Sequence, residues 1–361
     1  MNLQQEGAIT FETDGAFYNP KMKLNRDIGV AMTRSLSISS YLDALSASGI
    51  RGLRVAGEAG VERVTMNDIS PQACDLILKN IARNNLTNCE AICCNANALM
   101  HQRHFQAVDL DPFGSPSPFL TAGARSALSY LFITATDTAP LCGAHLKSGI
   151  RKYMARPLRT DYYPEMGARI LLGLACRELA RLDKAMEPML THATDHYVRT
   201  YLRVRRGAQS ADECLEKMGY VEHCLACGSF TTLREPRPVG VCGHCGHCGH
   251  SGHCGEKTVL AGPLWLGRIQ EADVILQARA NLDGSSRAEK LLETCASEVD
   301  VPFYYDHHII CERLGITPGK VDRVVEHIRA QGWRASRTHF SGIGIKTDAP
   351  LWAVEEASRR G

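Results

Sequence analysis

The sequence predicts an α/β fold built around a mostly parallel, doubly wound sheet, and two observations support this. Between residues 41 and 134, short apolar runs alternate with segments of helical character. Four of the apolar runs end in polar residues or glycine, as strands do at the ligand-binding edge of an open sheet. Strands that alternate with helices form right-handed βαβ units, so we expect a Rossmann-like domain.

The predicted elements follow in chain order. Strands are expected at residues 41–45, 61–66, 91–94, 105–110 and 131–134, and helices at 49–54, 70–85 and 118–128. Ser70 and Pro71 mark one helix start, because serine caps a first turn and proline fits its first position.

Composition sets limits on the class of protein. The chain has 361 residues, 22% charged and 44% hydrophobic, which is typical of a soluble protein of two or three domains. No apolar run approaches the roughly 20 residues that span a bilayer, and we see no secretory signal, so we expect a cytoplasmic protein with no membrane contact. The net charge of +2 confines any nucleic-acid surface to a local patch. The 15 cysteines predict reduced thiols, some of them on a metal.

Polar residues at four strand ends predict a nucleoside site. They lie at residues 43–49, at Asp68, at 95–97 and at 109–114. A single aspartate in such a place is usually a helix cap, but four strand ends line one crevice of a doubly wound sheet. Asp68 follows the glycine turn at Gly49 by about 20 residues, the spacing at which an acidic residue takes ribose hydroxyls.

The glycine turn favours S-adenosylmethionine over a dinucleotide. It contains only Gly49 and Gly52, with Arg51 between them, instead of the G-x-G-x-x-G pattern. A pyrophosphate needs a helix N-terminus free of bulk, whereas a guanidinium grips a free carboxylate in a bidentate way.

The run from Asp109 to Pro116 is the strongest sign of chemistry. Asp111 can accept a hydrogen bond from an exocyclic amine, a carbonyl near Pro112 can accept another, and Phe113 can stack on a base that has left its helix. Asp109 lies on the same face of the strand and is expected to be support. The alternative is a plain turn with Phe113 in the core.

Further motifs extend along the chain: Phe17–Pro20, Leu24–Asp27, Leu42–Gly52, Asn67–Ser70, Asp109–Pro116, Thr134–Asp137, Leu141–His145, Gly262–Gly267 and Thr338–Phe340. With these motifs the sequence resembles the archaeal tRNA (guanine-26-N2)-dimethyltransferases. The resemblance implies a class I methyltransferase domain, S-adenosylmethionine as donor, and one or two methyl groups placed on the 2-amino group of a guanine in tRNA.

The resemblance also implies roles for single residues. Asp111 and Phe113, with Pro112 between them, would face the guanine. The predicted donor-binding residues are Arg26, Arg51, Asp68, Asn95 and Ala96, with Phe17 and Asp43 from two of the motifs. Asn95 departs from the acidic residue of some relatives, but an amide can still bind adenine. Without the resemblance, Arg26 would be interpreted as part of a surface ion pair.

Residues 196–206 alternate with period two. The residues of one face are Tyr197, Arg199, Tyr201, Arg203 and Arg205. This pattern predicts a strand that buries its other face and shows arginines and tyrosines to an RNA, or else an ordinary solvated edge strand. Residues 151–159 carry a second basic cluster.

The cysteine segment predicts a structural zinc. Cys224 and Cys227 form one C-x-x-C pair, and a Cys-Gly-His repeat follows at residues 242–254. Two such pairs can hold one tetrahedral zinc. We choose Cys242 and Cys245 as the second pair, with Cys248 and Cys254 as alternatives.

The C-terminal part is predicted to be a smaller α+β unit. Residues 278–299 are expected to form an amphipathic helix, and residues 306–331 a helix-turn-helix pair. Residues 332–346 could form a hairpin wing with Arg334, Arg337 and Lys346 exposed.

We therefore expect three parts, all in one enzyme. They are a methyltransferase domain at 1–215, a zinc-binding segment packed on it at 216–267, and a tRNA-docking domain, winged-helix-like, at 268–361. The expected partner is tRNA, with no obligate protein partner. The alternatives are a zinc-containing RNA-binding protein with an inactive methyltransferase fold, and an amino methyltransferase acting on another RNA or on DNA.

Overall fold

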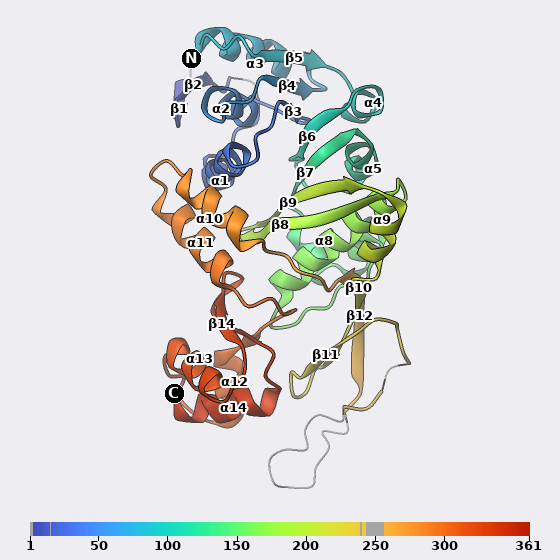
Figure 1. Cartoon of the computed structure of the whole chain (residues 1–361), viewed down its shortest axis with the longest axis vertical. Coiled ribbons are helices and arrows are strands. Elements are labelled where there is room, and N and C mark those ends of the chain that lie inside the picture. Colours follow the sequence, from blue (N-terminus) through green and yellow to red (C-terminus); the bar gives the residue numbers. More distant parts are fainter. Residues whose placement is uncertain (1–2, 15, 239, 243–255) are drawn as a thin grey trace.

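The computed structural model describes residues 3–14, 16–238, 240–242 and 256–361. Its centre is a seven-stranded sheet with the order β5-β4-β3-β6-β7-β9-β8 (Figure 1). The strands are β3 (Ser40–Asp43), β4 (Arg63–Asp68), β5 (Cys89–Cys93), β6 (Phe105–Leu110), β7 (Ala127–Ala135), β8 (Lys184–Thr194) and β9 (Tyr197–Arg206). Strands β3, β4, β5, β6 and β7 are parallel to one another, and β9 runs antiparallel to both of its neighbours, β7 and β8. The predicted α/β class is confirmed.

Helices cover both faces of this sheet. They are α1 (Lys23–Arg34), α2 (Ile50–Glu58), α3 (Pro71–Arg83), α4 (Ala96–Gln102), α5 (Ser117–Ser126), α6 (Thr138–Leu141), α7 (Leu146–Tyr153), α8 (Tyr163–Ala180) and α9 (Ala208–Leu215). Successive side chains of β6 point to opposite faces of the sheet. Val108 is buried in a hydrophobic cluster with α4, α5 and α8 on one face, and Ala107 in a second cluster with α1, α2 and α3 on the other. Near the N-terminus lie the hairpin of β1 (Leu3–Glu6) and β2 (Ile9–Glu12) and the short helix η1 (Pro20–Met22).

The prediction of an exposed arginine–tyrosine face on residues 197–205 is wrong for the first half of the strand. Strand β9 lies inside the sheet, between β7 and β8, and residues 197–202 are buried on both of its faces. Tyr197, Arg199 and Tyr201 are 3%, 0% and 0% exposed. Only the far end of β9, at Arg205 and Arg206, is exposed.

A second sheet follows the first. It consists of β10 (Met218–Cys224), β11 (Phe230–Leu233) and β12 (Thr258–Trp265), antiparallel and in the order β11-β10-β12. The inner side of this sheet joins the main core, because Val221 and Leu264 are buried in the same hydrophobic cluster as α8.

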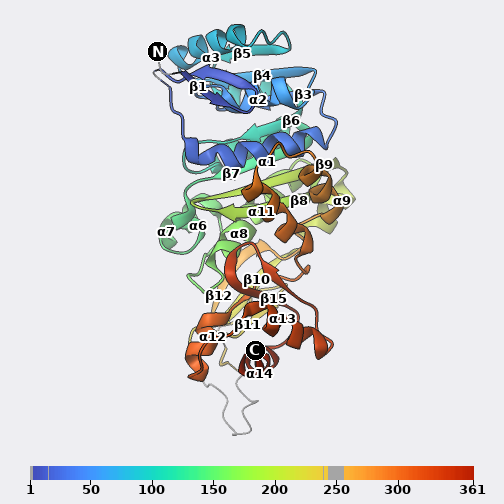
Figure 2. The ribbon, with the colours of Figure 1, turned by 90° about the vertical axis from the view of Figure 1, so that its left-hand side faces the viewer.

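The C-terminal part contains α10 (Ala272–Ala280), α11 (Ser286–Ser297), β13 (Tyr305–Asp306), α12 (His307–Leu314), α13 (Val321–Ala330), β14 (Ala335–Thr338), β15 (Ser341–Thr347) and α14 (Leu351–Arg360). Helices α10 and α11 pack on the sheet domain beside α1, whereas α12 to α14 form a module with its own core (Figure 2). The helix-turn-helix pair and the hairpin lie where the sequence predicted them.

Two predictions for this part are wrong. The single helix at 278–299 is two helices, because Asp283 and Gly284, the latter at φ +66°, interrupt it. Lys346 is 1% exposed instead of lying on the surface, because Glu165 and Glu298 pair with its ammonium group. No helix in the described ranges is both long enough and apolar enough to cross a membrane.

Candidate active site

The predicted site residues gather where the order of the sheet reverses. Strands β3 and β6 are neighbours there, and their register pairs Asp43 with Asp109. On the other side of β3 lies β4, which ends at Asp68. Ligands of open α/β sheets bind in the crevice at this switch point, beyond the carboxyl ends of the strands.

Asp109 is buried and holds two arginines in place. Both of its oxygens accept hydrogen bonds from Arg199, at 2.7 and 2.6 Å, and Oδ2 also accepts one from the Tyr41 hydroxyl at 2.5 Å. Burial alone would raise the pKa of Asp109, but Arg199 and Arg51 hold it below its ordinary value. Asp109 therefore remains a carboxylate, which agrees with its predicted supporting role. No motif of the sequence pointed to Arg199 as its partner.

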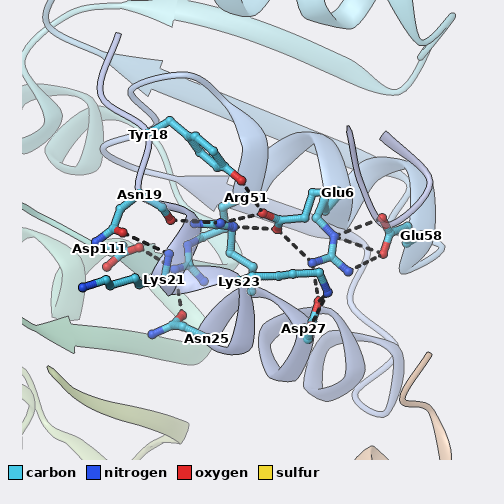
Figure 3. A network of polar contacts seen from close by, with 12 residues as sticks. Glu6, Tyr18, Asn19, Lys21, Lys23, Asn25, Asp27, Arg51, Glu58 and Asp111 are labelled. Atoms are coloured by element: carbon cyan, nitrogen blue, oxygen red, sulfur yellow. Dashed lines mark hydrogen bonds and ion pairs between the residues drawn. The ribbon is translucent and has the colours of Figure 1, made fainter. Parts of the chain in front are cut away.

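Arg51 joins this cluster to the predicted catalytic acid. Its Nη2 atom donates to Asp111 and, at 2.8 Å, to Asn25 on α1 (Figure 3). Its Nη1 atom lies 3.7 Å from Asp109, too far for a hydrogen bond. Burial lowers the pKa of Arg51, but Asp111 and Asp109 more than offset this and raise it. The guanidinium thus stays charged between two carboxylates.

The loop after β6 presents an aromatic surface. Phe113 is 90% exposed and Phe17 is 61% exposed, and their rings meet edge to face with centroids 5.8 Å apart. The alternative of Phe113 as a core residue is therefore excluded, whereas Pro112 is buried beneath it. The Gly114 amide donates to Thr136 Oγ1 at 2.8 Å, which fixes the loop to the end of β7. Two exposed rings at a switch point suit the face of a planar base.

Asp43 lies under the glycine turn. Its Oδ2 atom accepts a hydrogen bond from the Gly52 amide at 3.1 Å. Burial raises the pKa of Asp43 to about 7, against the opposing effect of Arg51. Gly52 is required here, since a Cβ atom on it would lie 2.4 Å from the side chain of Met66.

The other predicted donor-binding residues of this edge shape its loops. The carboxylate of Asp68 accepts hydrogen bonds from the amides of Ala47 and Ser70, both at 2.9 Å. Asn95 is exposed and caps α4, with its Oδ1 atom 2.9 Å from the Asn97 amide. Ala96 is the first residue of α4 and is buried.

Arg26 is not a surface residue. It is 5% exposed and makes a bidentate ion pair with Glu6 of β1, at 2.7 and 2.6 Å. Its guanidinium also lies over the ring of Tyr18. The surface ion pair expected from the local sequence alone is therefore wrong, and Glu6, which no motif pointed to, is the residue that holds Arg26.

Three of the predicted zinc cysteines come together. The sulfur atoms of Cys224, Cys227 and Cys242 lie within 4.8 Å of one another, and Cys224 and Cys242 are buried. The Gly228 amide donates to the Cys224 carbonyl at 2.8 Å, which closes a tight turn between the first two thiols. Cys245, Cys248 and Cys254 lie outside the described residues.

Acids, a buried arginine and an exposed aromatic surface at the switch point of a mixed, mostly parallel sheet are typical of a Rossmann-like enzyme, and the match to a solved methyltransferase structure reported below makes the class that of the α/β methyltransferases. Comparison with protein families identifies the family. The family model described as N2,N2-dimethylguanosine tRNA methyltransferase matches residues 1–359, and the chain belongs to this family.

Relatives of known name agree. A tRNA (guanine(26)-N(2))-dimethyltransferase of Methanosarcina mazei is 48% identical over 94% of this chain and 90% of its own length. The protein of the same name from Methanoculleus marisnigri is 43% identical over 94% and 90%. The solved structure of Trm1 from Pyrococcus horikoshii with S-adenosyl-L-methionine is 37% identical, covers 99% of each chain and has a TM-score of 0.89.

Proposed function

We propose that the protein transfers methyl groups from S-adenosylmethionine to the exocyclic N2 atom of guanine 26 in tRNA. The observation that carries the proposal is the placement of Asp111, Pro112 and Phe113 at the switch point of a chain that belongs to this family. The site offers a carboxylate and an exposed ring side by side. These are the groups that an amine on a flat base requires.

The residues on the donor side fit S-adenosylmethionine. Among the described residues, Arg51 Nη1 and Asn25 Nδ2 are buried and have no hydrogen-bond partner. Two such donors beside a glycine turn suit the carboxylate of an amino-acid tail. We propose that Arg26, Arg51, Asp68, Asn95 and Ala96 hold the donor together with Phe17 and Asp43. When bound, the donor supplies an electrophilic methyl group.

The residues on the acceptor side orient the amine. Asp111 accepts a hydrogen bond from N2, which directs the nitrogen lone pair toward the methyl group. As the nitrogen–carbon bond forms and the sulfur–methyl bond breaks, Asp111 stabilises the positive charge on nitrogen and accepts the proton that N2 loses. The carbonyl of Pro112 accepts the second N–H. Phe113 holds the plane of the base, which has to leave the RNA stack to arrive. Arg51 keeps Asp111 in position through their ion pair.

The test is methyl transfer to an unmodified tRNA carrying guanine at position 26, with adenine at that position as the control. We expect mono- or dimethylated guanine in the first tRNA and no product in the second. Methylation of both, or of neither, would overturn the assignment of the substrate. Ribosomal RNA and DNA tested in parallel examine the alternative amino methyltransferase, and tRNA binding without turnover would indicate the inactive RNA-binding protein.

We also propose a structural zinc held by Cys224, Cys227 and Cys242 and by a fourth thiol, Cys245, with Cys248 and Cys254 as alternatives. Three clustered thiols around a tight turn suit the tetrahedral coordination of zinc. The cysteines lie at the end of β10, and the second sheet stands apart from β6 and the main sheet in Figure 1, so we assign the metal no part in methyl transfer.

Metal analysis of three single variants tests the identity of the fourth ligand. We expect Cys245→Ser to lose zinc, and Cys248→Ser and Cys254→Ser to keep one zinc per chain. Zinc loss in one of the latter two instead would assign the ligand to that residue. Full zinc retention in Cys227→Ser would refute the site.

A further inference from the structure

A large cavity lies beside the candidate active site and is not used by the proposed donor or guanine contacts. It has a volume of about 1000 Å³ and lies between the end of the main sheet and the C-terminal part. Its cationic lining comes from three segments far apart in the sequence, which supply four side chains: Arg159, Arg287, Lys290 and Arg337. The turn between β8 and β9 adds Asp195 and His196. Cations thus outnumber acids on this wall.

Two of the cations are free to bind an anion. Arg287 pairs with Asp195 at 2.7 Å and Arg337 with Asp322 at 3.0 Å. Arg159 and Lys290 are exposed, and neither has an ion-pair partner among the residues that the structure describes. A wall of solvated cations with unpaired members attracts a polyanion and releases its counterions on binding.

Two residues that line the cavity, Thr138 and Leu24, lie close along the chain to residues that contact the loop of Asp111 or Arg51. The backbone of Gly114 in this loop is hydrogen-bonded to Thr136, and Thr138, two residues further on, lines the cavity. On the opposite side Leu24 lines it, next to Asn25, which binds Arg51. A strand whose base is held at Phe113 would therefore continue into the cavity.

We propose that this cavity binds the sugar–phosphate backbone adjoining the target nucleotide, with Arg159 and Lys290 as phosphate contacts. The inference rests on the proposed RNA substrate. It adds a binding surface made jointly by the α7–α8 connection, the helix α11 and the β14–β15 hairpin (Figure 2). The arginines already paired with Asp195 and Asp322 form the rim of this surface.

The test compares the double variant R159A/K290A with the control R125A/K79A, whose side chains are exposed on α5 and α3. Affinity for an unmodified tRNA is measured against salt concentration, and kcat and KM of methyl transfer are measured separately. We expect the salt slope of the R159A/K290A variant to decrease by about 1.4 to 1.8, the value for two phosphate contacts. The KM for tRNA should rise at least 10-fold with kcat unchanged, and the control should match the wild type.

The two proposals can fail separately. Unchanged affinity and salt slope in R159A/K290A, with an active wild type, would overturn the cavity as an RNA site and leave the proposed function intact. A wild type that binds tRNA through these residues but transfers no methyl would overturn the function alone. A wild type that does not bind tRNA would overturn both.

Discussion

Two clusters of buried charge lie at different places in this molecule. The strand-end cluster consists of Asp43, Asp109, Asp111, Arg51 and Arg199. The interdomain cluster consists of Glu165, Arg169, Glu298, His339 and Lys346, and it joins α8 to α11 and the β14–β15 hairpin. Both contain carboxylates that could not be buried alone.

The clusters differ in how completely they are closed. In the interdomain cluster Lys346 bridges Glu165 at 3.1 Å and Glu298 at 3.2 Å, and all of these side chains are at most 2% exposed. In the strand-end cluster Asp111 is 20% exposed, so this cluster reaches the surface. Among the described residues both clusters contain buried polar atoms without a hydrogen bond: Arg51 Nη1 in the strand-end cluster, and Glu165 Oε2 and His339 Nε2 in the interdomain cluster. The interdomain cluster, which is closed to solvent, holds α8 and the C-terminal part together. The strand-end cluster is open to solvent at Asp111, where a ligand can reach it.

Removing Asp111 has the largest expected effect, and it should fall on activity alone. Asp111→Asn keeps the shape but weakens the acceptor for the amine, so kcat should decrease by about 10²- to 10⁴-fold. Because Arg51 retains Asp109 nearby, donor affinity by calorimetry should change less than about 3-fold. Asp75→Asn, exposed on α3, is the control. If the Asp111→Asn variant is as active as the wild type, the strand-end cluster has no catalytic role that the interdomain cluster lacks.

Removing Lys346 should have the opposite signature. Lys346→Met leaves Glu165 and Glu298 short of a buried partner, so the free energy of unfolding should decrease by about 3–5 kcal/mol. Donor affinity below the melting transition should stay unchanged. Chemical denaturation and calorimetry measure the two quantities, with Lys320→Met at an exposed position as control. Loss of donor binding in the folded variant would show that the clusters are coupled.

The pH dependence of stability should have opposite signs for Asp43 of the strand-end cluster and Glu298 of the interdomain cluster. Burial raises the pKa of Asp43 from 3.8 to about 7, so the folded state holds its proton longer and stability falls as pH rises through this interval. For Glu298, burial is outweighed by His339 and Lys346, which lower the pKa from 4.5 to about 2. Its stabilisation is complete above pH 4.5 and is lost as pH falls toward 2.

Urea titrations across pH check both signs. In Asp43→Asn, the free energy of unfolding should decrease less steeply between pH 4 and 7. In Glu298→Gln, it should decrease less steeply as the pH falls from 4.5 to 2. Each slope should change by up to about 1.4 kcal/mol per pH unit. Identical pH profiles for the wild type and both variants would contradict the assignment.

The smallest predicted effect concerns the edge of the open cluster. The ring of Phe17 supports Phe113 edge to face, a contact worth about 0.5–1.5 kcal/mol. Phe17→Ala should therefore raise the KM for tRNA by about 2- to 12-fold, with the melting temperature unchanged. Leu78→Ala, exposed on α3, is the control for loss of a surface apolar group. If Phe17→Ala has the KM of the wild type, the ring of Phe17 does not support the binding of the base at Phe113.

The open cluster was largely predictable and the closed one was not. Strand β6 begins and ends where its apolar run does, and the run after it combines residue types that a plain turn does not need. Glu165, Glu298 and Lys346 come from three distant elements with no spacing to connect them. Local pattern therefore placed Lys346 on the surface.

Strand β9 shows the same limit within the open cluster. Alternating arginines and tyrosines resemble a solvated face, but the partner of Arg199 is Asp109, 90 residues earlier. Only the order of the sheet, which inserts β9 between β7 and β8, brings them together.

This insertion has a consequence for synthesis on the ribosome. The strands through β7 are synthesised before β8 and β9, so Asp109 leaves the exit tunnel well before its partner Arg199. A nascent chain that stops near residue 150 holds a buried carboxylate without its bidentate partner, which costs several kcal/mol. The cluster around Asp109 is therefore complete only after β8 and β9 have been synthesised and have joined the sheet.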